Sequence, residues 1–361
     1  MYDYLIVGAG IAGAVIARKL TDAGKKCLVL ERKPVTGGTI RTEKMAGIDC
    51  HIHGAHVYRT DDEETWQFLN KYVSFNNFIN SPLANYKGRI FNLPFNMNTF
   101  NALWKMETPD KARIMVESQR THYVNPKNLE QHCLNMVGRD IYEMFIKGYT
   151  EKQWGRPCTE LEPATIRRIK LRFTYNNNYY DAKYQGVTDY NKLIEKLLEG
   201  SKVILNTGYD VSNIEYRSQA KKVIYTGALD EYYQYCFGKL EYRSLRFEHQ
   251  ELNMPDYQGN AVVNYTDRKV PYTRIIEHKH FMRVDTPTTV ISKEYPAEWV
   301  EGMEKYYPIN DEKNEALYKK YRAKADEEGL IIVGKLAEYQ YWDMDETVRS
   351  ALNKAEEVLH G

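Results

Sequence analysis

The sequence predicts an α/β fold in which a Rossmann-type dinucleotide-binding domain carries an inserted helical domain and an antiparallel β-sheet domain. Three observations predict this fold class. A glycine-rich fingerprint opens the chain, short helical patterns follow one another over residues 99–147, and strand patterns with few helices between them fill residues 240–294. Consecutive strands of this kind favour an antiparallel sheet over further βαβ units.

The fingerprint lies between a predicted buried strand, Tyr4 to Val7, and a predicted helix, Ile11 to Thr21. Three glycines have the G-x-G-x-x-G spacing that permits a tight turn, a close approach to a pyrophosphate and close helix packing: Gly8, Gly10 and Gly13. A second strand, Lys26 to Leu30, ends in Glu31, where an acid is expected to bind a ribose hydroxyl. The pattern predicts a βαβ unit whose helix N-terminus faces the pyrophosphate.

A second glycine pair, Gly37 and Gly38, follows the acid closely. In a nicotinamide enzyme the next crossover would come quickly after the acid. The order found here instead resembles the FAD-binding domain of flavoproteins such as the amine oxidases. This resemblance favours FAD over NAD as the cofactor.

The composition narrows the class of partner. The chain has 361 residues with 50 Lys and Arg against 49 Asp and Glu, so its charge offers no bulk attraction for nucleic acid or anionic membrane, and a small-molecule partner is expected. Its five cysteines include no C-x-x-C pair, which argues against a disulfide framework and a zinc site. No apolar run is long enough to span a bilayer and no basic leader precedes the first apolar stretch, so we expect an unexported, cytoplasmic protein.

After the glycine pair, Gly47 to Thr60 is predicted to form a short hairpin that carries three histidines: His51, His53 and His56. A metal site is the alternative that they raise, but no acidic or thiol ligand accompanies them, and we predict no metal. Thr60 and Glu63 form a capping-box signature for a helix that continues to about Tyr72.

The remaining elements follow from periodicity and turn residues. Residues 80–98 are rich in Pro, Asn and Gly and mark a boundary. Helices are expected at Thr99 to Trp104, Pro109 to Gln119, Leu129 to Val137, Asp140 to Lys147, Thr188 to Glu199, Asp311 to Glu328 and Asp345 to Leu359. Strands are expected at Arg168 to Tyr180, Lys202 to Asn206, Lys222 to Gly227, Leu240 to Phe247, Asn260 to Tyr265, Tyr272 to His278, Thr289 to Glu294 and Leu330 to Val333.

These elements suggest three domains. Residues 1–79 form the FAD-binding domain, completed by 201–232 and 311–361. Residues 80–160 form the helical insertion, and residues 161–200 and 233–310 form the antiparallel substrate domain.

Eight segments together resemble the UDP-galactopyranose mutase family: Asn80 to Ala84 (NSPLA), Phe91 to Thr99 (FNLPFNMNT), Lys147 to Gly155 (KGYTEKQWG), Arg168 to Tyr175, Leu240 to Phe247 (LEYRSLRF), Pro271 to His278 (PYTRIIEH), Tyr306 to Asp311 and Leu336 to Met344 (LAEYQYWDM). They occur in the family's order and cover essentially the whole chain. The resemblance implies an FAD-dependent isomerase that interconverts the six- and five-membered ring forms of a UDP-linked sugar, with no net redox change. It also implies galactofuranose for cell-surface polysaccharides as the product.

By the same resemblance, reduced flavin attacks the anomeric carbon and displaces UDP, so that the protein needs no Ser, Cys or carboxylate nucleophile. The implied partners are the UDP-sugar substrate, a cellular flavin reductant and a second copy of the chain in a homodimer. The departing diphosphate requires positive charge, which the resemblance assigns to two catalytic arginines, Arg168 and Arg274.

The resemblance also assigns the lining of both sites. Substrate-binding residues are Asn80, Phe145, Tyr149, Thr150, Trp154, Tyr179, Asn264, Tyr307 and Tyr341, with Arg59 near the sugar. Cofactor-binding residues are Gly8, Gly10, Ala12, Gly13, Glu31, Arg32, Gly38, Thr39, His56, Val57, Arg243, Lys335, Asp343 and Met344.

Four positions depart from the family pattern. Thr39 stands where Asn is usual, Val333 where Gly is usual and Lys335 where Arg is usual, and these three bear on flavin affinity or redox tuning. Arg59 replaces a His in the H-x-x-H pattern that begins at His56. We expect Arg59 to extend the substrate range from UDP-galactose to UDP-N-acetylgalactosamine; the alternative is a surface ion pair with Asp61 or Asp62.

Two other functions are compatible with the N-terminal fold, because a fold does not determine a function. One is a conventional FAD-dependent oxidoreductase of the amine-oxidase-like fold. The other is a flavin-binding protein without catalysis. An amine or alcohol oxidase has no need of a diphosphate clamp, and the arginine pair with the tyrosines therefore favours the mutase.

Overall fold

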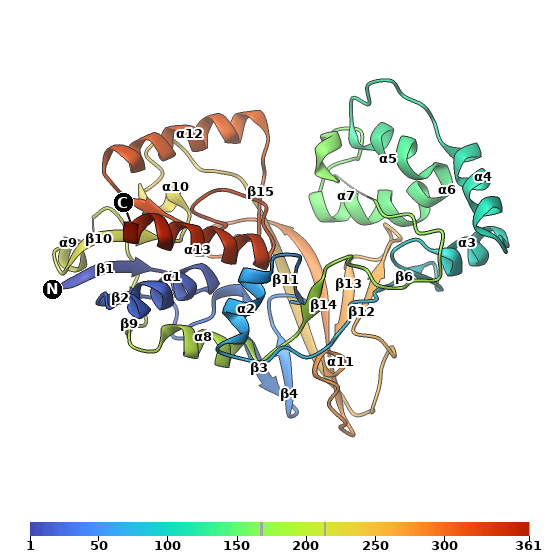
Figure 1. Cartoon of the computed structure of the whole chain (residues 1–361). Coiled ribbons are helices and arrows are strands. Elements are labelled where there is room, and N and C mark those ends of the chain that lie inside the picture. The colour runs from blue at the N-terminus through green and yellow to red at the C-terminus, as the bar shows by residue number, and fades with distance from the viewer. Residues whose placement is uncertain (167–168, 213, 361) are drawn as a thin grey trace.

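The computed structural model describes residues 1–166, 169–212 and 214–360. Figure 1 shows an elongated molecule, with the two chain ends in one part, a helical part at the opposite side and strands between them. Two sheets organise these parts, one of five strands and one of seven. The predicted fold class is confirmed.

The five-stranded sheet is parallel, with the order β16-β10-β1-β2-β9. Its strands are β1 (Tyr2–Val7), β2 (Cys27–Leu30), β9 (Lys202–Ile204), β10 (Ala220–Tyr225) and β16 (Ile331–Ile332). One face packs against α1 (Ile11–Asp22), α8 (Tyr190–Leu198) and α13 (Met344–His360), and the other lies towards α10 (Leu229–Tyr232) and α12 (Glu312–Glu327). Alternate β1 residues enter the two cores, Ile6 the first and Leu5 the second, as expected for a sheet covered on both faces.

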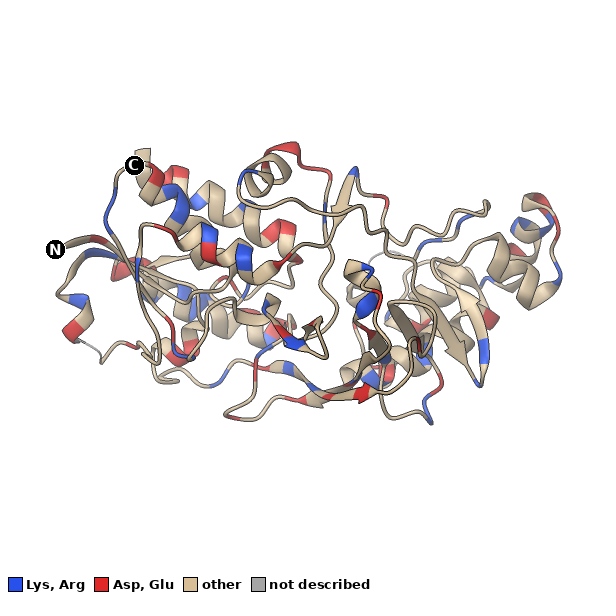
Figure 2. Cartoon of the chain, turned by 90° about the horizontal axis from the view of Figure 1, so that it is seen from below, with Lys and Arg blue, Asp and Glu red and all other residues tan. Residues whose placement is uncertain are grey.

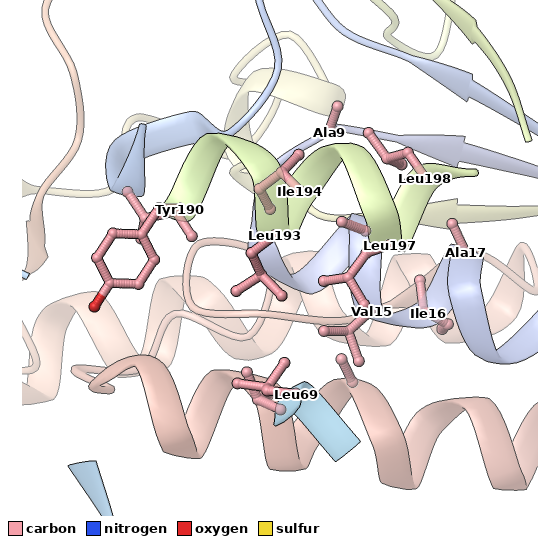
Figure 3. Close-up of a cluster of buried hydrophobic side chains, with 14 of the residues drawn as sticks. Ala9, Val15, Ile16, Ala17, Leu69, Tyr190, Leu193, Ile194, Leu197 and Leu198 are labelled. Atoms are coloured by element: carbon pink, nitrogen blue, oxygen red, sulfur yellow. The ribbon is translucent and has the colours of Figure 1, made fainter. Parts of the chain in front are cut away.

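Apolar residues of α8 and α1 form much of the first core. Figure 3 shows Leu193 and Leu197 of α8 on the side of Val15 and Ile16 of α1, with Ile194 on another face of α8 beside Leu198. All but Leu198 are at most 1% exposed. This packing positions α1, and the glycine loop before it, relative to the parallel sheet.

The seven-stranded sheet has the order β15-β11-β14-β13-β12-β6-β7 and is antiparallel apart from the β12–β6 pair. Its strands are β6 (Leu83–Tyr86), β7 (Arg89–Asn92), β11 (Tyr242–Leu252), β12 (Val262–Tyr265), β13 (Arg274–Glu277), β14 (Thr289–Glu298) and β15 (Tyr307–Pro308). Its register places Asn264 opposite Arg274, and Arg274 opposite Glu294. Residues directly opposite one another share a face, so these three form one row.

Shorter elements surround the two sheets. Two-stranded sheets pair β3 (Thr42–Met45) with β4 (Ile48–His51), and β5 (Tyr58–Thr60) with β8 (Tyr184–Gly186). The helical part contains α3 (Met97–Trp104), α4 (Pro109–Gln119), α5 (Leu129–Val137), α6 (Arg139–Ile141), the π-helical segment η2 (Tyr142–Lys147) and α7 (Gly148–Trp154). Also present are α2 (Glu63–Asn70), α9 (Ile214–Arg217), α11 (Lys279–Met282) and the 3-10 turns η1 (Gly38–Ile40) and η3 (Pro163–Thr165).

Several expected elements differ from the structure. Described residues 169–180 form bends and irregular backbone with one isolated bridge, Leu171 to Phe95, instead of strands. Side-chain oxygens there accept backbone N–H groups, Asn176 from Asn178 and Thr174 from Asn176, and such local bonds compete with a strand ladder.

The predicted hairpin at Gly47 to Thr60 lies earlier, as β3 and β4, so His53 and His56 lie in the loop after it. The cap of α2 is Asp62 and not Thr60: its carboxylate accepts the N–H groups of Glu64 and Thr65. Part of residues 80–98, expected to be only a boundary, forms β6 and β7 of the large sheet.

The described helices include none with the length and hydropathy that a membrane crossing requires. Figure 2 shows basic and acidic residues interspersed along the chain, in agreement with a formal net charge of +1.

Candidate active site

The loop between β1 and α1 has the geometry of an anion site. Gly8 has φ +103°, and a Cβ on Gly13 would lie 1.9 Å from the Gly8 carbonyl oxygen, so both positions require glycine. Helix α1 begins after Gly10 with no side-chain cap and no acid in its first turn. Its first backbone N–H groups therefore remain available to an anion at the positive end of the helix.

Glu31 is 6% exposed at the end of β2, and backbone donors hold both of its carboxylate oxygens. One oxygen accepts the Ala9 N–H at 2.9 Å, and the other accepts the Lys33 N–H at 3.0 Å. A Cβ on Gly38 would lie 3.2 Å from the Gly10 Cα, so the second glycine pair packs directly against the first loop. The free helix end and the adjacent acid fit a dinucleotide.

The other predicted cofactor residues near this loop occupy varied positions. Thr39 lies within η1, and the exposed Arg32 forms an ion pair of 3.4 Å with Glu231. Ala12 lies on α1 next to Gly334, whose φ is +94° and whose Cβ would lie 2.7 Å from the Ala12 Cβ. Val333 stands where Gly is usual, but the glycine that this close approach requires is the next residue, Gly334.

His56, in the loop after β4, has a ring nitrogen that can accept a hydrogen bond. Its Nδ1 lies 2.7 Å from the carbonyl oxygen of Gly54, so Nδ1 must donate, and Nε2 keeps a lone pair. Burial lowers the pKa of His56 to about 4, which keeps the ring neutral. His51 and His53 are engaged elsewhere: His51 Nδ1 accepts the His56 N–H, and His53 Nδ1 lies 2.6 Å from the Tyr306 hydroxyl.

Arg274 is the centre of the second cluster. Its Nε donates to Glu294 at 2.8 Å, and the Glu294 side chain is 1% exposed. Burial by itself would lower the pKa of Arg274, but the Glu294 carboxylate holds it well above its ordinary value. No described residue hydrogen-bonds to its two terminal nitrogens, and in the same row the buried Oδ1 of Asn264 has no partner among the described residues. A ligand could therefore accept hydrogen bonds from the Arg274 terminal nitrogens and donate one to Asn264 Oδ1.

Four predicted tyrosines come close enough to Arg274 for its charge to act on their hydroxyls: Tyr149, Tyr179, Tyr307 and Tyr341. The Tyr307 and Tyr341 rings lie 5.3 Å apart, and Trp154 lies 6.4 Å from Tyr341. Desolvation by the surrounding protein raises the pKa of all four tyrosines, to about 12 for Tyr179, so the hydroxyls stay protonated and can donate. Tyr179 and Tyr341 nevertheless keep 38% and 56% of their surface exposed.

Lys335 adds a second cation to this cluster. Its Nζ lies 5.0 Å from the ring centre of Tyr307 and 5.7 Å from that of Tyr341. Burial lowers the pKa of Lys335 to about 8, although Asp343 and Glu346 oppose the shift.

Arg59 lies at the edge of the same cluster and not on an isolated surface. It forms an ion pair with Asp343, and its guanidinium stacks 4.2 Å from the ring centre of Tyr180. The alternative pairing with Asp61 or Asp62 is wrong, because Asp62 binds Arg349 and Asp61 accepts the N–H of Lys183.

The remaining predicted substrate residues are placed unevenly. Asn80 accepts the Tyr179 N–H through its backbone at 2.8 Å, and Thr150 is buried on α7. Phe145 packs in the helical core, 4.9 Å from the Phe91 ring. Arg168 lies outside the described residues.

Three predicted cofactor residues make other contacts. Val57 and Met344 pack against the core of the parallel sheet. Arg243 is 6% exposed, and its Nε donates to the Gln153 carbonyl at 3.1 Å near the end of α7. It lines a cavity of about 380 Å³ together with residues of α7 and β14.

Glu294 and Tyr180 belong to the cluster but were absent from the predicted site. The predicted strand Thr289 to Glu294 ends in Lys293 and Glu294, as a solvated strand end would, so nothing in the sequence indicated that the Glu294 carboxylate is buried. Tyr180 gave no signal either, since it differs from its neighbour Tyr179 only in tertiary position.

Comparisons with known proteins extend over the whole chain. A family model described as UDP-galactopyranose mutase matches residues 144–341, and one described as an NAD(P)-binding Rossmann-like domain matches residues 6–72. The chain is 36% identical to a probable UDP-galactopyranose mutase of Klebsiella pneumoniae, over 99% of this chain and 94% of that protein. It is 35% identical to a dTDP-fucopyranose mutase of Escherichia coli, over 99% and 98% of the two chains. A crystal structure of reduced UDP-galactopyranose mutase has a similar fold, with a TM-score of 0.77 and 15% identity over 99% of this chain and 94% of that one.

Proposed function

The chain belongs to the UDP-galactopyranose mutase family of flavin-dependent isomerases, and from this premise we propose that it uses reduced FAD to interconvert the pyranose and furanose forms of UDP-galactose and UDP-N-acetylgalactosamine. The observation that carries the proposal is the state of Arg274. Its guanidinium is charged and held by a buried carboxylate. Its terminal nitrogens have no hydrogen-bond partner among the described residues, and its charge acts on four tyrosine hydroxyls. Such a cluster suits a diphosphate better than the substrate of an amine or alcohol oxidase.

The chemistry that FAD supplies when bound in reduced form is nucleophilic attack on the anomeric carbon of the sugar. The glycine loop and Glu31 would hold the dinucleotide at the uncapped N-terminus of α1. The terminal nitrogens of Arg274 would donate hydrogen bonds to the diphosphate oxygens. These bonds strengthen as the bond to the sugar breaks, because negative charge on the oxygens then increases. Arg168 is proposed as the second cation of this clamp.

Glu294 orients this charge. Its hydrogen bond to Nε leaves the other edge of the Arg274 guanidinium towards the ligand, and Thr273 donates to the same carboxylate oxygen at 3.1 Å. The tyrosine hydroxyls hold the released diphosphate by neutral donors, so that it can return to the sugar. Trp154 ends α7 with its ring 6.4 Å from that of Tyr341, and it is proposed to help exclude water once the substrate is bound.

A direct test compares reduced and oxidised protein. Dithionite-reduced enzyme should convert UDP-galactose, and separation of the products by chromatography should show the furanose form. Oxidised enzyme should be inactive, because oxidised flavin lacks the nucleophilic lone pair. Equal turnover in both states would remove the flavin from the chemistry.

Arg59 supports the wider sugar range. Its guanidinium is held between Asp343 and the Tyr180 ring, next to Tyr179. One terminal nitrogen donates to Asp343, and the other N–H groups of the five can serve a ligand. One of these can donate to the carbonyl of an acetamido group on the second carbon of the sugar. Arg59→His should therefore reduce relative efficiency with the acetamido sugar, by about 1–3 kcal/mol, while sparing UDP-galactose. Equal losses with both sugars, or no loss, would reject this role.

A second substrate class has a specific observation in its favour. The identity with the dTDP-fucopyranose mutase, 35%, is nearly that with the probable UDP-galactopyranose mutase. Assaying dTDP-fucose beside the two UDP-sugars decides between them. Turnover of dTDP-fucose alone would keep the reaction type but replace the proposed substrate.

A further inference from the structure

The side chain of Lys152 is enclosed by backbone carbonyl groups of the loop between β12 and β13. Its Nζ donates to four carbonyl oxygens at 2.7–3.0 Å: those of Tyr265, Asp267, Val270 and Tyr272. An ammonium group has three N–H donors, so all are satisfied and one is shared. Within the described residues Lys152 forms no salt bridge, and the carbonyl dipoles compensate its charge instead.

This contact joins two parts of the proposed substrate site. The loop connects Asn264, near the end of β12, to Arg274, the first residue of β13. Lys152 extends into it from α7, which also carries Tyr149 and Trp154. The loop backbone is folded around a side chain of the facing helix, so the position of the helix and the path of the loop depend on each other.

A glycine on the same helix face strengthens the joint. Gly148 precedes Lys152 by four residues, and a Cβ there would lie 2.5 Å from the Thr266 carbonyl oxygen and 3.0 Å from the Arg268 nitrogen. Helix α7 therefore touches the loop backbone directly. Gly148 sets the distance of closest approach, and Lys152 closes the loop one turn further on.

Several charged groups surround this joint. Asp267 lies on the loop, and Arg268 pairs with Glu151 of α7 at 3.0 Å. Arg156, Arg243 and Glu298 line the adjoining cavity of about 380 Å³ with Lys152. Burial lowers the pKa of Lys152 to about 8, against the charge of Asp267, whereas the four carbonyl oxygens favour the protonated form.

We propose that Lys152 is a positioning residue: by folding the β12–β13 loop around its ammonium group, it sets Asn264 and Arg274 on the sheet relative to Tyr149 and Trp154 on α7. This role rests on the proposed diphosphate site. Lys152 itself does not touch the reacting atoms; it acts through the residues that do.

The first test compares two Lys→Met variants of the flavin-loaded protein. Lys152→Met keeps the length of the side chain but removes the ammonium. Lys269→Met makes the same change on an exposed lysine of the same loop. Calorimetric titration should show UDP binding weakened at least about tenfold in Lys152→Met and unchanged in Lys269→Met, with flavin content equal in both. Hydrogen exchange of residues 265–273 should accelerate in Lys152→Met alone.

The second test is chemical rescue, which a packing role would not show. In Lys152→Ala the carbonyl cage is left without its cation, and ammonium chloride should restore UDP binding and slow exchange in the loop. Tetramethylammonium chloride at equal ionic strength should do neither, because that ion exceeds the space defined by oxygens 2.7–3.0 Å from Nζ.

Wild-type UDP affinity in Lys152→Met, or an affinity lost in Lys152→Ala without rescue by ammonium, would overturn the proposal. Neither readout requires turnover. Protein that binds UDP but converts neither sugar would reject the proposed function and leave this test valid. If wild-type protein does not bind UDP, loop exchange with and without ammonium still decides whether Lys152 organises the loop.

Discussion

The two candidate binding regions of this molecule are built in opposite ways. The dinucleotide loop is formed by backbone groups of one short stretch, Gly8 to Gly13, supported by Glu31 at the end of the next strand. The Arg274 cluster is formed by side chains from β12, β13, β14, β15, α7 and the segments that carry Tyr179 and Tyr341. A change in the first region should therefore act through backbone fit and cofactor retention. A change in the second should act on the substrate while the cofactor stays bound.

The largest effect is expected for Gly13→Val. Any Cβ at this position would meet the Gly8 carbonyl oxygen at 1.9 Å, so α1 must move away from β1 and the helix N-terminus with it. Overpacking of this kind typically costs about 1–3 kcal/mol or more, and we expect loss of bound flavin, measured as the ratio of flavin to protein absorbance.

Gly208→Val is the matched control for this change, since a Cβ there has open space around it. It should keep the flavin. If Gly13→Val keeps the same ratio of flavin to protein absorbance, flavin binding by the glycine loop does not depend on this close approach.

An intermediate effect is expected for Arg274→Ala. Loss of a charge-assisted hydrogen bond to the diphosphate costs about 1.5–3 kcal/mol, or roughly 10- to 150-fold in kcat/KM. The flavin ratio should stay at the wild-type value, in contrast to Gly13→Val. Arg168→Ala is expected to behave in the same way.

Arg246→Ala serves as the control for both arginines, because Arg246 is exposed on β11 and pairs with Glu248. Full efficiency in either clamp variant would remove that arginine from the clamp. Loss of flavin from Arg274→Ala would instead show that the two regions are not independent.

A further effect, visible only when the pH is changed, concerns Lys335. Burial lowers its folded-state pKa to about 8 from the ordinary 10.5, so between these values the unfolded chain binds more protons than the folded one. The contribution of Lys335 to the free energy of unfolding therefore rises with pH through this window, by at most about 1.4 kcal/mol per pH unit.

UDP affinity should change in the opposite direction, falling as the ammonium beside Tyr307 and Tyr341 loses its charge. Denaturant titrations and UDP titrations at several pH values should show both trends in the wild-type protein. Subtracting the profiles of Lys335→Met isolates this residue from other lysines. Identical profiles in the two proteins would place the Lys335 charge outside the site.

The sequence by itself determined the parallel-sheet unit and its glycine loop. The turn at Gly8, the helix start after Gly10 and the strand that ends at Glu31 depend on backbone preferences and apolar periodicity within neighbouring residues, which a single sequence displays. The helices Pro109–Gln119 and Leu129–Val137 have the predicted bounds for the same reason. The resemblance to the mutase family supplied the predicted site residues. The comparisons confirm that the chain belongs to this family, but the roles of those residues remain predictions.

Only the tertiary structure decided which side chains meet. The row of Asn264, Arg274 and Glu294 depends on the register of three strands, and a shift of one residue would turn Arg274 to the other face. Arg59 binds Asp343, far along the chain, because β5 lies beside the start of α13, while the nearby Asp61 and Asp62 have other partners. The predicted strand at residues 169–180 is replaced by bends, where local side chains accept backbone N–H groups. A local sequence pattern reflects the backbone conformations that neighbouring residues favour. These contacts depend instead on the packing of segments that are distant in the sequence and meet only in the folded protein.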